Sequence, residues 1–285
     1  MRNILLADAG SSKTNWSFLN GETREYTRIQ TIGINPAHED ISSIITTLYE
    51  VKDRIKNNVL SEIYYYGAGC ANQFMSLPVE YALTKVFGAE KISVRSDLMG
   101  ASIALFGDSD GIACILGTGS ASALISKGEI KQQTPSLGYI LGDEGSGVAL
   151  GKSLLNSVFK KQLSCNLIHK FQDRYKLNVS ELIEKVYRET KPARYIASFS
   201  PFLLENIEEE EIRILVIKEF ENYFIKNILP YENFQNFNVG IVGSIAYNYQ
   251  EILSQSAAKF GIKIEKILKD PMPALESFYL HKISE

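Results

Sequence analysis

One sequence pattern, an apolar strand followed by a small-residue turn and a second strand, occurs twice in this chain and constrains its fold more than any other feature. An apolar run at residues 4–7 stops at a small-residue turn over residues 8–12 and then resumes in alternating form. The same order returns at residues 112–116, 117–120 and 121–125. A polar, glycine-containing turn between two such runs is typical of a β-hairpin. Two hairpins that each open one half of the chain suggest a duplicated fold, while the alternative is an ordinary α/β protein with two unrelated hairpins.

Strand and helix periodicities alternate around these hairpins. Before the second hairpin the pattern predicts strands at 25–31, 63–67 and 91–95 and helices at 39–57, at 79–87 and from Asp97. After it, the pattern predicts helices at 152–170, 179–190 and 209–228, one through 253–260 and one from 274, with strands at 239–242 and 263–267. This alternation indicates a mixed α/β layer fold.

The chain of 285 residues is long enough for two domains, at roughly 150 residues per domain. The strongest turn cluster, residues 107–111, marks the expected boundary. We expect one domain at 1–107, completed by a helix at 272–285, and a second domain at 108–271.

Composition excludes several classes of protein. Lys and Arg number 30 against 33 Asp and Glu, a net charge of −3, so a broad basic surface for nucleic acid is not expected. No apolar run approaches the ~18 residues of a membrane span, and a strand-like segment stands where a leader would be, so we expect no membrane partner and a cytoplasmic location. Cys70, Cys114 and Cys165 are odd in number and lack C-x-x-C spacing, which disfavours a disulfide framework and a zinc site.

Small-residue turns follow three of the predicted buried strands, at residues 8–14, 117–120 and 243–244. Backbone N–H groups in such turns form concavities that bind phosphate oxygens. None of the turns fits G-x-x-x-x-G-K-[ST] or G-x-G-x-x-G. Each alone is explained at least as well by a structural role, but together on a repeated scaffold they suit a nucleotide whose phosphates are held from two sides.

Two acidic residues stand where predicted strands end. Asp8 must be solvated, hydrogen bonded or linked to a metal, because an unpaired buried charge is costly. A Mg²⁺ that accompanies a triphosphate, often through water, would satisfy Asp8, and a turn-forming Asp is the alternative. Asp97 opens a predicted helix, where it can act as the base of a phosphoryl transfer or as an ordinary N-cap.

The segment at residues 138–147 places Asp143 and Glu144 among four glycines. Such a density of glycine is costly unless the backbone makes unusual turns or approaches a ligand closely. Paired acids beside a turn can hold two vicinal hydroxyls, so this segment predicts a polyol or sugar ligand, with a purely structural loop as the alternative.

With these motifs in view, the chain resembles the sugar kinases of the BadF/BadG/BcrA/BcrD ATPase family, and most closely its N-acetylglucosamine kinases. Residues 8–14 resemble the first phosphate motif, residues 117–120 the second, and residues 242–244 the adenosine motif, while residues 142–146 are the most specific match. The motifs occur in order over nearly the whole chain. The resemblance implies a two-domain, actin-like ATPase fold of the ribonuclease H-like type, with duplicated mixed sheets, flanking helices and an interdomain cleft.

The resemblance also implies roles for individual residues. It makes Asp97 the catalytic base and a sugar contact, and it gives Asn35 in the segment 33–36 the role of binding the amino sugar. The other residues so implied are Gly138 and Asp143 for the sugar, Gly10, Ser11, Lys13, Thr14, Gly117, Thr118 and Gly119 for ATP phosphates, Ala197, Gly243 and Ser244 for the adenine side, and Asp8 for Mg²⁺ through water. For Lys13 an exposed hairpin lysine is an equal alternative.

The implied activity is Mg²⁺- and ATP-dependent phosphorylation of an N-acetylated amino sugar, N-acetylglucosamine at its 6-hydroxyl, by a protein that the family resemblance suggests is a homodimer. Residues 135–138 depart from the glycine- and tryptophan-rich stretch of the family, so N-acetylmuramic acid, N-acetylmannosamine, glucosamine and glucose stay open as acceptors. Two alternatives stay open as well: an ATPase coupled to a protein partner, and a non-catalytic sugar sensor. The cysteines show no pairing motif for the cluster-bridging ATPases.

Overall fold

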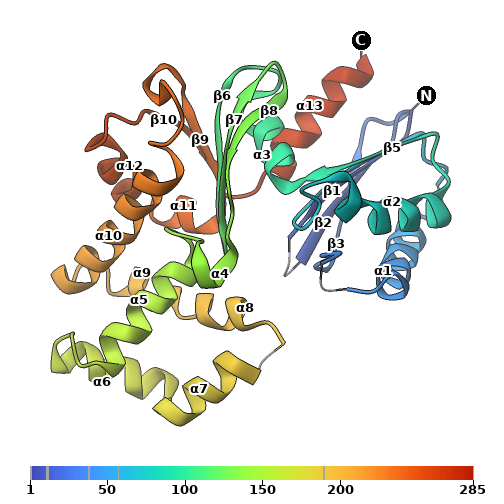
Figure 1. The fold of residues 1–285 in the computed structure, drawn as a ribbon. Helices are drawn as coiled ribbons and strands as arrows, with labels where there is room; N and C mark the ends of the chain where they lie inside the picture. The colour runs from blue at the N-terminus through green and yellow to red at the C-terminus, as the bar shows by residue number, and fades with distance from the viewer. Residues whose placement is uncertain (1, 11–12, 38, 57, 189, 285) are drawn as a thin grey trace. The chain divides into compact units, whose positions relative to one another are not determined.

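The computed structural model describes residues 2–10, 13–37, 39–56, 58–188 and 190–284. These residues form two compact units (Figure 1). The first unit comprises Met1–Ser109, Lys127–Glu129 and Asp270–Glu285, and the second comprises Asp110–Ser126 and Ile130–Lys269. Within the described ranges, no helix combines the length and the apolar character needed to cross a bilayer.

The first unit is one sheet with helices on both faces. Its elements are β1 (Ile4–Ala9), β2 (Lys13–Leu19), β3 (Tyr26–Ile32), α1 (Ile41–Arg54), β4 (Glu62–Gly67), α2 (Gln73–Phe87), β5 (Lys91–Ser96), α3 (Asp97–Phe106) and α13 (Met272–Ser284).

The second unit has a sheet of the same size and a larger set of helices. Its elements are β6 (Gly111–Leu116), β7 (Ser120–Ser126), β8 (Glu129–Thr134), α4 (Gly138–Leu141), α5 (Gly147–Phe159), α6 (Cys165–Tyr175), α7 (Val179–Arg188), α8 (Pro192–Ala197), α9 (Ser200–Glu205), α10 (Glu210–Asn227), the 3₁₀ turn η1 (Phe234–Asn236), β9 (Val239–Val242), α11 (Ser244–Asn248), α12 (Gln250–Ala258) and β10 (Ile264–Leu268).

The two sheets have the same strand order. The first reads β3-β2-β1-β4-β5 and the second reads β8-β7-β6-β9-β10, each with five strands. In both, a hairpin supplies an antiparallel pair, β1 with β2 and β6 with β7, and later strands join in parallel. The predicted α/β fold with duplicated mixed sheets flanked by helices is therefore confirmed.

The parallel register brings the carboxyl ends of the central strands to one edge of each sheet. In the first sheet Gly67 of β4 pairs with Ala9 of β1 and with Ser96 of β5. In the second sheet Val242 of β9 pairs with Leu268 of β10. Ligands of open α/β sheets bind outside the carboxyl ends of the strands, so each sheet has one edge where functional residues are expected.

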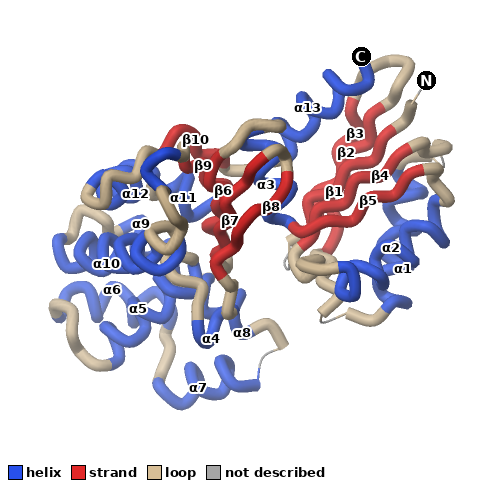
Figure 2. The backbone as a smooth tube through the Cα atoms, turned by 45° about the horizontal axis from the view of Figure 1, so that its top comes forward, coloured by secondary structure: helices blue, strands red, loops and turns tan. Residues whose placement is uncertain are grey.

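Helices α1 and α2 cover one face of the first sheet (Figure 2). Side chains on a strand alternate between its two faces, and Leu5, Ala7 and Ala9 of β1 are fully buried against these helices. Asp8 therefore points to the opposite face, where α3 and α13 pack.

Helix α13 is held on the first sheet by buried polar contacts. Ser17 donates a hydrogen bond from Oγ to Glu276 Oε1 at 2.7 Å, and Arg28 donates from Nε to the same oxygen at 2.8 Å. The hydroxyls of Tyr66 and Tyr279 hydrogen bond to each other. Glu276 is 2% exposed, and a carboxylate so buried is stable only with such partners. These contacts make α13 an integral element of the first unit.

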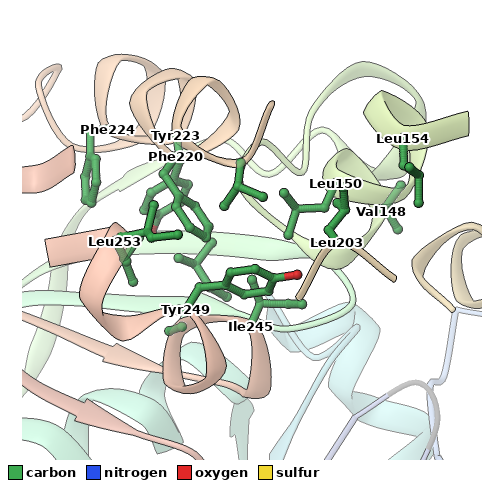
Figure 3. Close-up of a cluster of buried hydrophobic side chains, with 14 of the residues drawn as sticks. Val148, Leu150, Leu154, Leu203, Phe220, Tyr223, Phe224, Ile245, Tyr249 and Leu253 are labelled. Carbon is green, nitrogen blue, oxygen red and sulfur yellow. The ribbon is translucent and has the colours of Figure 1, made fainter. Parts of the chain in front are cut away.

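The core of the second unit lies where its helices converge on one face of the second sheet. Figure 3 shows Leu150 of α5, Leu203 of α9, Phe220 of α10 and Leu253 of α12 directed toward one another. All four side chains are completely excluded from solvent. This core fixes the amino-terminal ends of α5 and α11, which lie beside the candidate site.

One predicted helix is wrong. The apolar pattern predicted a single helix at 152–170, but α5 ends at Phe159 and α6 begins at Cys165. Lys161 between them adopts a left-handed backbone with φ of 54°, and Gln162 N donates to Ser157 O at 2.8 Å. This closed turn ends the helix, although apolar residues continue at helical spacing.

Other elements were missed or began earlier than predicted. Helix α2 begins at Gln73 rather than at 79, because Asn72 caps it by accepting a hydrogen bond from Met75 N at 3.1 Å. Strand β8 and the short helices α4, α8 and α9 were not predicted.

Candidate active site

The first predicted phosphate turn joins β1 to β2. Asp8 near the end of β1 lies opposite Asn15 in the register, and Gly10 N donates to Lys13 O at 3.0 Å to close the turn. Lys13 is exposed. Ser11, which was assigned to phosphate, lies outside the described residues.

Thr14 was also assigned to phosphate, but it is fully buried. Its Oγ1 accepts a hydrogen bond from Ile34 N at 3.2 Å. The hydroxyl thus fastens the segment 33–37, which we call the acceptor loop, to β2. This internal partner and the lack of exposed surface favour a structural role for Thr14 over a phosphate contact.

Three carboxylates interact at the carboxyl edge of the first sheet: Asp8 near the end of β1, Asp97 after β5, and Asp270 before α13. Burial raises the pKa of Asp8 to about 7, the negative charges of Asp270 and Asp97 add to that rise, and the Lys13 ammonium opposes it. Burial likewise raises the pKa of Asp97, against hydrogen bonds from backbone amides. The edge is therefore short of positive charge.

A divalent cation would supply the positive charge that is lacking beside these three carboxylates. Mg²⁺ prefers carboxylate oxygens and usually binds through one or two carboxylates together with waters and substrate phosphates. The described residues contain no group of three or more His, Cys, Asp or Glu side chains arranged to hold a metal on their own. The residues at this edge thus fit a cation that arrives with phosphates better than one held by protein alone.

The structure separates two interpretations of Asp97. Ser96 is the N-cap of α3, since its Oγ accepts a hydrogen bond from Met99 N at 3.4 Å. Asp97 is the first residue of the helix, and its Oδ1 accepts from Leu98 N at 2.9 Å. The alternative that Asp97 is the N-cap is therefore wrong.

Asn35 lies in the acceptor loop, where its Oδ1 accepts a hydrogen bond from Ala37 N at 3.0 Å. The buried Tyr65 connects it to the carboxylates: Tyr65 Oη donates to Ile34 O at 3.4 Å. Burial raises the pKa of Tyr65 well above its usual value, and the charges of Cys70, Glu39, Asp8 and Asp97 raise it further. Tyr65 thus bonds to the backbone of the acceptor loop and lies within electrostatic range of Asp8 and Asp97.

The second predicted phosphate turn follows β6 and is tied to the start of α5. Gly117 N donates to Gly119 O at 3.0 Å, which closes the turn. Gly147 N donates to Gly117 O at 2.8 Å, and Val148 N donates to Thr118 O at 3.1 Å. The carbonyls of the turn are thereby occupied, and the side chain of Thr118 is exposed.

The predicted adenosine turn meets the second phosphate turn. Gly243 has φ of 136°, and a Cβ at this position would lie 2.1 Å from Leu116 O, so only glycine allows the two turns to approach. Ser244, the first residue of α11, is exposed. A Cβ built on Gly147 would lie 3.2 Å from the Ala197 Cβ and 3.6 Å from Ile245. The second unit therefore brings Gly117, Ala197 and the adenosine turn together at the start of α5.

Asp143 lies in the segment 142–146, which we call the acidic loop. It has a left-handed φ of 58°, and its Oδ1 accepts a hydrogen bond from Ser120 N at 3.1 Å. Burial raises the pKa of Asp143, the bond from Ser120 and the charge of Lys152 lower it, and Glu144 raises it. Asp143 thus lies directly against the second phosphate turn. Gly138 is exposed at the start of α4, where its carbonyl accepts from Gly142 N at 2.8 Å.

Glu144 makes different contacts from Asp143. Its carboxylate accepts hydrogen bonds from Lys226 Nζ at 3.0 Å and from Asn227 Nδ2 at 3.4 Å. Burial acts to raise the pKa of Glu144, but these hydrogen bonds bring it below its usual value. Glu144 therefore attaches the acidic loop to the end of α10.

The predicted site residues are thus distributed over both units. Asp8, Gly10, Lys13, Asn35 and Asp97 belong to the first unit. Those of the second unit are Gly117, Thr118, Gly119, Gly138, Asp143, Ala197, Gly243 and Ser244. The sequence interpretation missed the roles of Asp270 beside Asp8 and of Lys226 beside Glu144, because no motif marks either residue.

Solved structures resemble this chain along its whole length. A structure of a candidate N-acetylglucosamine kinase from Porphyromonas gingivalis has a TM-score of 0.92 and 38% sequence identity, over 98% of this chain and 99% of that one. A second candidate N-acetylglucosamine kinase, from Chromobacterium violaceum, has a TM-score of 0.77 and 16% identity over 98% and 99% of the two chains. A ROK family glucokinase from Streptomyces griseus, solved with glucose and AMPPNP, has a TM-score of 0.55 and 11% identity over 98% and 97%.

No family model and no curated protein matches the chain. The last two structures share only the fold, but the 38% identity to the first extends over nearly all of both chains. That relationship, with the repeated sheets and the glycine turns at their carboxyl edges, establishes the family. The chain belongs to the N-acetylglucosamine kinase-like sugar kinases of the actin-like ATPase fold, and it is an ATP-dependent sugar kinase.

Proposed function

We propose that this kinase transfers the γ-phosphoryl group of ATP to the 6-hydroxyl of an N-acetylated amino sugar, N-acetylglucosamine, with Asp97 as general base. The name of the 38% identical relative supports the acceptor. The observation that carries the proposal is that Asp8 and Asp97 interact at the carboxyl edge of the first sheet, where the loop after β4 contacts Asn35.

Asp97 suits the role of base in both geometry and protonation. The Leu98 amide holds one carboxylate oxygen, which fixes the orientation of the group at the start of α3. Its raised pKa makes the ionised carboxylate a stronger proton acceptor. In the proposed step, Asp97 takes the proton of the acceptor hydroxyl as its oxygen bonds to the γ-phosphorus, and the bond from phosphorus to the bridging oxygen breaks to release ADP.

Asn35 and Asp143 bind the acceptor in this proposal, and Gly138 borders it. An amide and a carboxylate together offer donors and acceptors for the hydroxyl and N-acetyl groups of an amino sugar. Their effect is positional, since holding the hydroxyl in line with the γ-phosphoryl group removes much of the entropic barrier.

The glycine turns bind ATP. In the proposal, Gly10, Lys13, Gly117, Thr118 and Gly119 contact phosphate oxygens, because glycine turns let backbone N–H groups approach a phosphate closely. Ala197, Gly243 and Ser244 border the adenosine, which agrees with their convergence at the start of α5.

Asp8 would hold Mg²⁺ through water. When bound, the cation supplies positive charge that neutralises the phosphate oxygens and aligns the triphosphate. The carboxylate of Asp8 is suited to this role because burial and neighbouring negative charges destabilise its ionised form, and a nearby cation would stabilise that form.

A coupled assay of ADP release tests the proposal. The purified chain with MgATP is offered N-acetylglucosamine, N-acetylmannosamine, N-acetylmuramic acid, glucosamine and glucose, and products are assigned by ³¹P and ¹H NMR. We expect the highest kcat/KM with N-acetylglucosamine and a 6-phosphate product. Faster turnover with another sugar would reassign the acceptor, and ADP release that no sugar accelerates would point instead to an ATPase coupled to a protein partner.

A further inference from the structure

The short loop between β4 and α2 contacts the side chain of Asn35 through a glycine. Gly69 in this loop has φ of +83°, a conformation that residues with side chains rarely adopt. A Cβ built on Gly69 would lie 2.2 Å from Asn35 Oδ1 and 3.1 Å from Asn35 Cγ. The Asn35 amide therefore occupies space that any other residue at position 69 would fill.

The loop itself is firmly attached, so a clash would displace Asn35 rather than the loop. Ala68 N donates to Ala9 O at 2.8 Å, which ties the loop to the end of β1. Cys70 N donates to Gly67 O at 3.1 Å, and the Cys70 side chain is only 4% exposed. Burial raises the pKa of Cys70 to about 12, and the charge of Asp97 adds to this rise, so the loop also lies beside the proposed base.

We propose that Gly69 is a positioning residue of the sugar site, whose missing side chain sets where the Asn35 amide lies. This inference rests on the proposed function, in which Asn35 binds the acceptor. The Asn35 Oδ1 is held on its other side by Ala37 N at 3.0 Å. The amide is thus fixed between the acceptor loop and the bare Cα of Gly69, and a displacement of Oδ1 would also break the bond from Ala37.

The structure offers a matched control for the two properties of Gly69, which are its positive φ and the close contact that a Cβ would make. A second glycine has only the first of these properties. Gly88, which ends α2 in the same unit, also has a positive φ, +62°, but a Cβ there would meet nothing within 4 Å. Gly88→Ala therefore imposes the backbone strain of a left-handed alanine without a steric contact, whereas Gly69→Ala imposes both.

The kinetic test compares these two variants. We expect Gly69→Ala to raise the KM for the sugar about tenfold or more relative to Gly88→Ala, since small misplacements of positioning groups have effects of this size. The KM for ATP should agree within about twofold between the variants, because Asn35 acts on the acceptor. An equal sugar KM in both variants, or an equal rise in both substrate KM values, would overturn the proposal.

A double-mutant cycle on stability tests the contact without any assay of activity. Asn35→Ala removes the amide that a Cβ at position 69 would strike. We expect Gly69→Ala to lower the Tm more than Gly88→Ala does, and expect most of this excess to disappear in the Asn35→Ala background, where only the contact with Pro36 Cδ at 3.3 Å is left. An excess of undiminished size there would contradict the proposal. If Gly69→Ala alone fails to fold, the double variant should recover folding, and its failure to do so would contradict the proposal equally.

The two tests also distinguish the inference from the function on which it rests. If no sugar is phosphorylated by the parent protein, the proposed function fails, while the stability cycle still reports whether Gly69 sets the place of Asn35. If sugars are phosphorylated but the cycle is additive, only the inference about Gly69 fails.

Discussion

The backbone amide of Ser120 donates a hydrogen bond to Asp143 Oδ1 at 3.1 Å, and this bond joins the second phosphate turn to the acidic loop. A Cβ built on Gly119 in the same turn would lie 3.0 Å from both carboxylate oxygens of Asp143. The residue proposed to hold the sugar therefore also supports the turn proposed to hold phosphate, so changes at Asp143 should affect both substrates.

We predict that Asp143→Ala raises the KM for ATP as well as the KM for the sugar, and lowers kcat/KM for the sugar about tenfold or more. Asp143→Asn keeps an oxygen that can accept from Ser120 N, so its KM for ATP should stay near that of the parent. Steady-state kinetics with each substrate varied in turn measure both effects. An unchanged KM for ATP in the alanine variant would show that the hydrogen bond does not support the turn.

Asp97→Asn should lower kcat about 10²-fold or more, as expected when a general base is lost. The amide oxygen of Asn can still accept from Leu98 N, so the start of α3 should be preserved. Affinity for ATP, measured by isothermal titration calorimetry, should remain close to that of the parent. Parental turnover in this variant would remove Asp97 from the mechanism.

Asp8→Asn should stabilise the protein at neutral pH in the absence of Mg²⁺ and nucleotide. The pKa of Asp8 is raised from 3.8 to about 7, so the folded state binds its proton more tightly than the unfolded state does. The stabilising contribution of protonated Asp8 is full below about pH 4 and is lost as the pH rises through about 7. The neutral Asn does not suffer this loss, so its free energy of unfolding should exceed that of the parent at neutral pH.

The measurement is the difference in Tm between Asp8→Asn and the parent from pH 4 to pH 8, which should grow as the pH rises. Asp108→Asn removes an exposed carboxylate after α3 and serves as the charge-matched control. An equal trend in the control would attribute the effect to net charge. Sugar phosphorylation by Asp8→Asn should fall at every pH, because the variant lacks the carboxylate proposed to hold the cation.

Thr14→Val should destabilise the first unit and weaken sugar binding, because it leaves the buried Ile34 N–H without its acceptor. The expected cost in the free energy of unfolding is about 1–3 kcal/mol. Thr14→Ser keeps the hydroxyl and should retain most of the stability. Urea unfolding measures the first effect and the sugar KM the second. If Thr14→Val instead raised only the KM for ATP, Thr14 would act on phosphate and not on the acceptor loop.

Much of the fold could be predicted because its main signals are local. The apolar runs at residues 4–7 and 112–116 and the turns that follow them identified both hairpins and their repetition. Strand β8 was missed because it is a polar strand at the edge of its sheet, where no alternation of buried residues is required. The break between α5 and α6 was missed because Lys161, a residue with no special preference for left-handed backbone, makes the turn.

The candidate site was predictable only where a motif carries it. Asp97 stands in a recognisable segment, but the sequence does not show whether Ser96 or Asp97 is the N-cap of α3. That depends on which side chain accepts a hydrogen bond from Met99 N, and the fold decides it. The partner of Glu144 could not be predicted, since Lys226 lies 82 residues away in the chain. For Gly69 a signal was present, because small residues follow the buried strand β4 as they follow β1.

The attachment of α13 to the first sheet has a consequence for biosynthesis. Ser17 and Glu276, which share a buried hydrogen bond, are 259 residues apart in the chain. As the chain leaves the ribosome, the first sheet emerges early but cannot obtain its covering helix until translation has passed through the entire second unit. Contacts between such distant segments slow folding, so the nascent first sheet must wait with one face covered only by α3. This protein should therefore depend on chaperones during synthesis more than a chain whose units close in the order in which they are made.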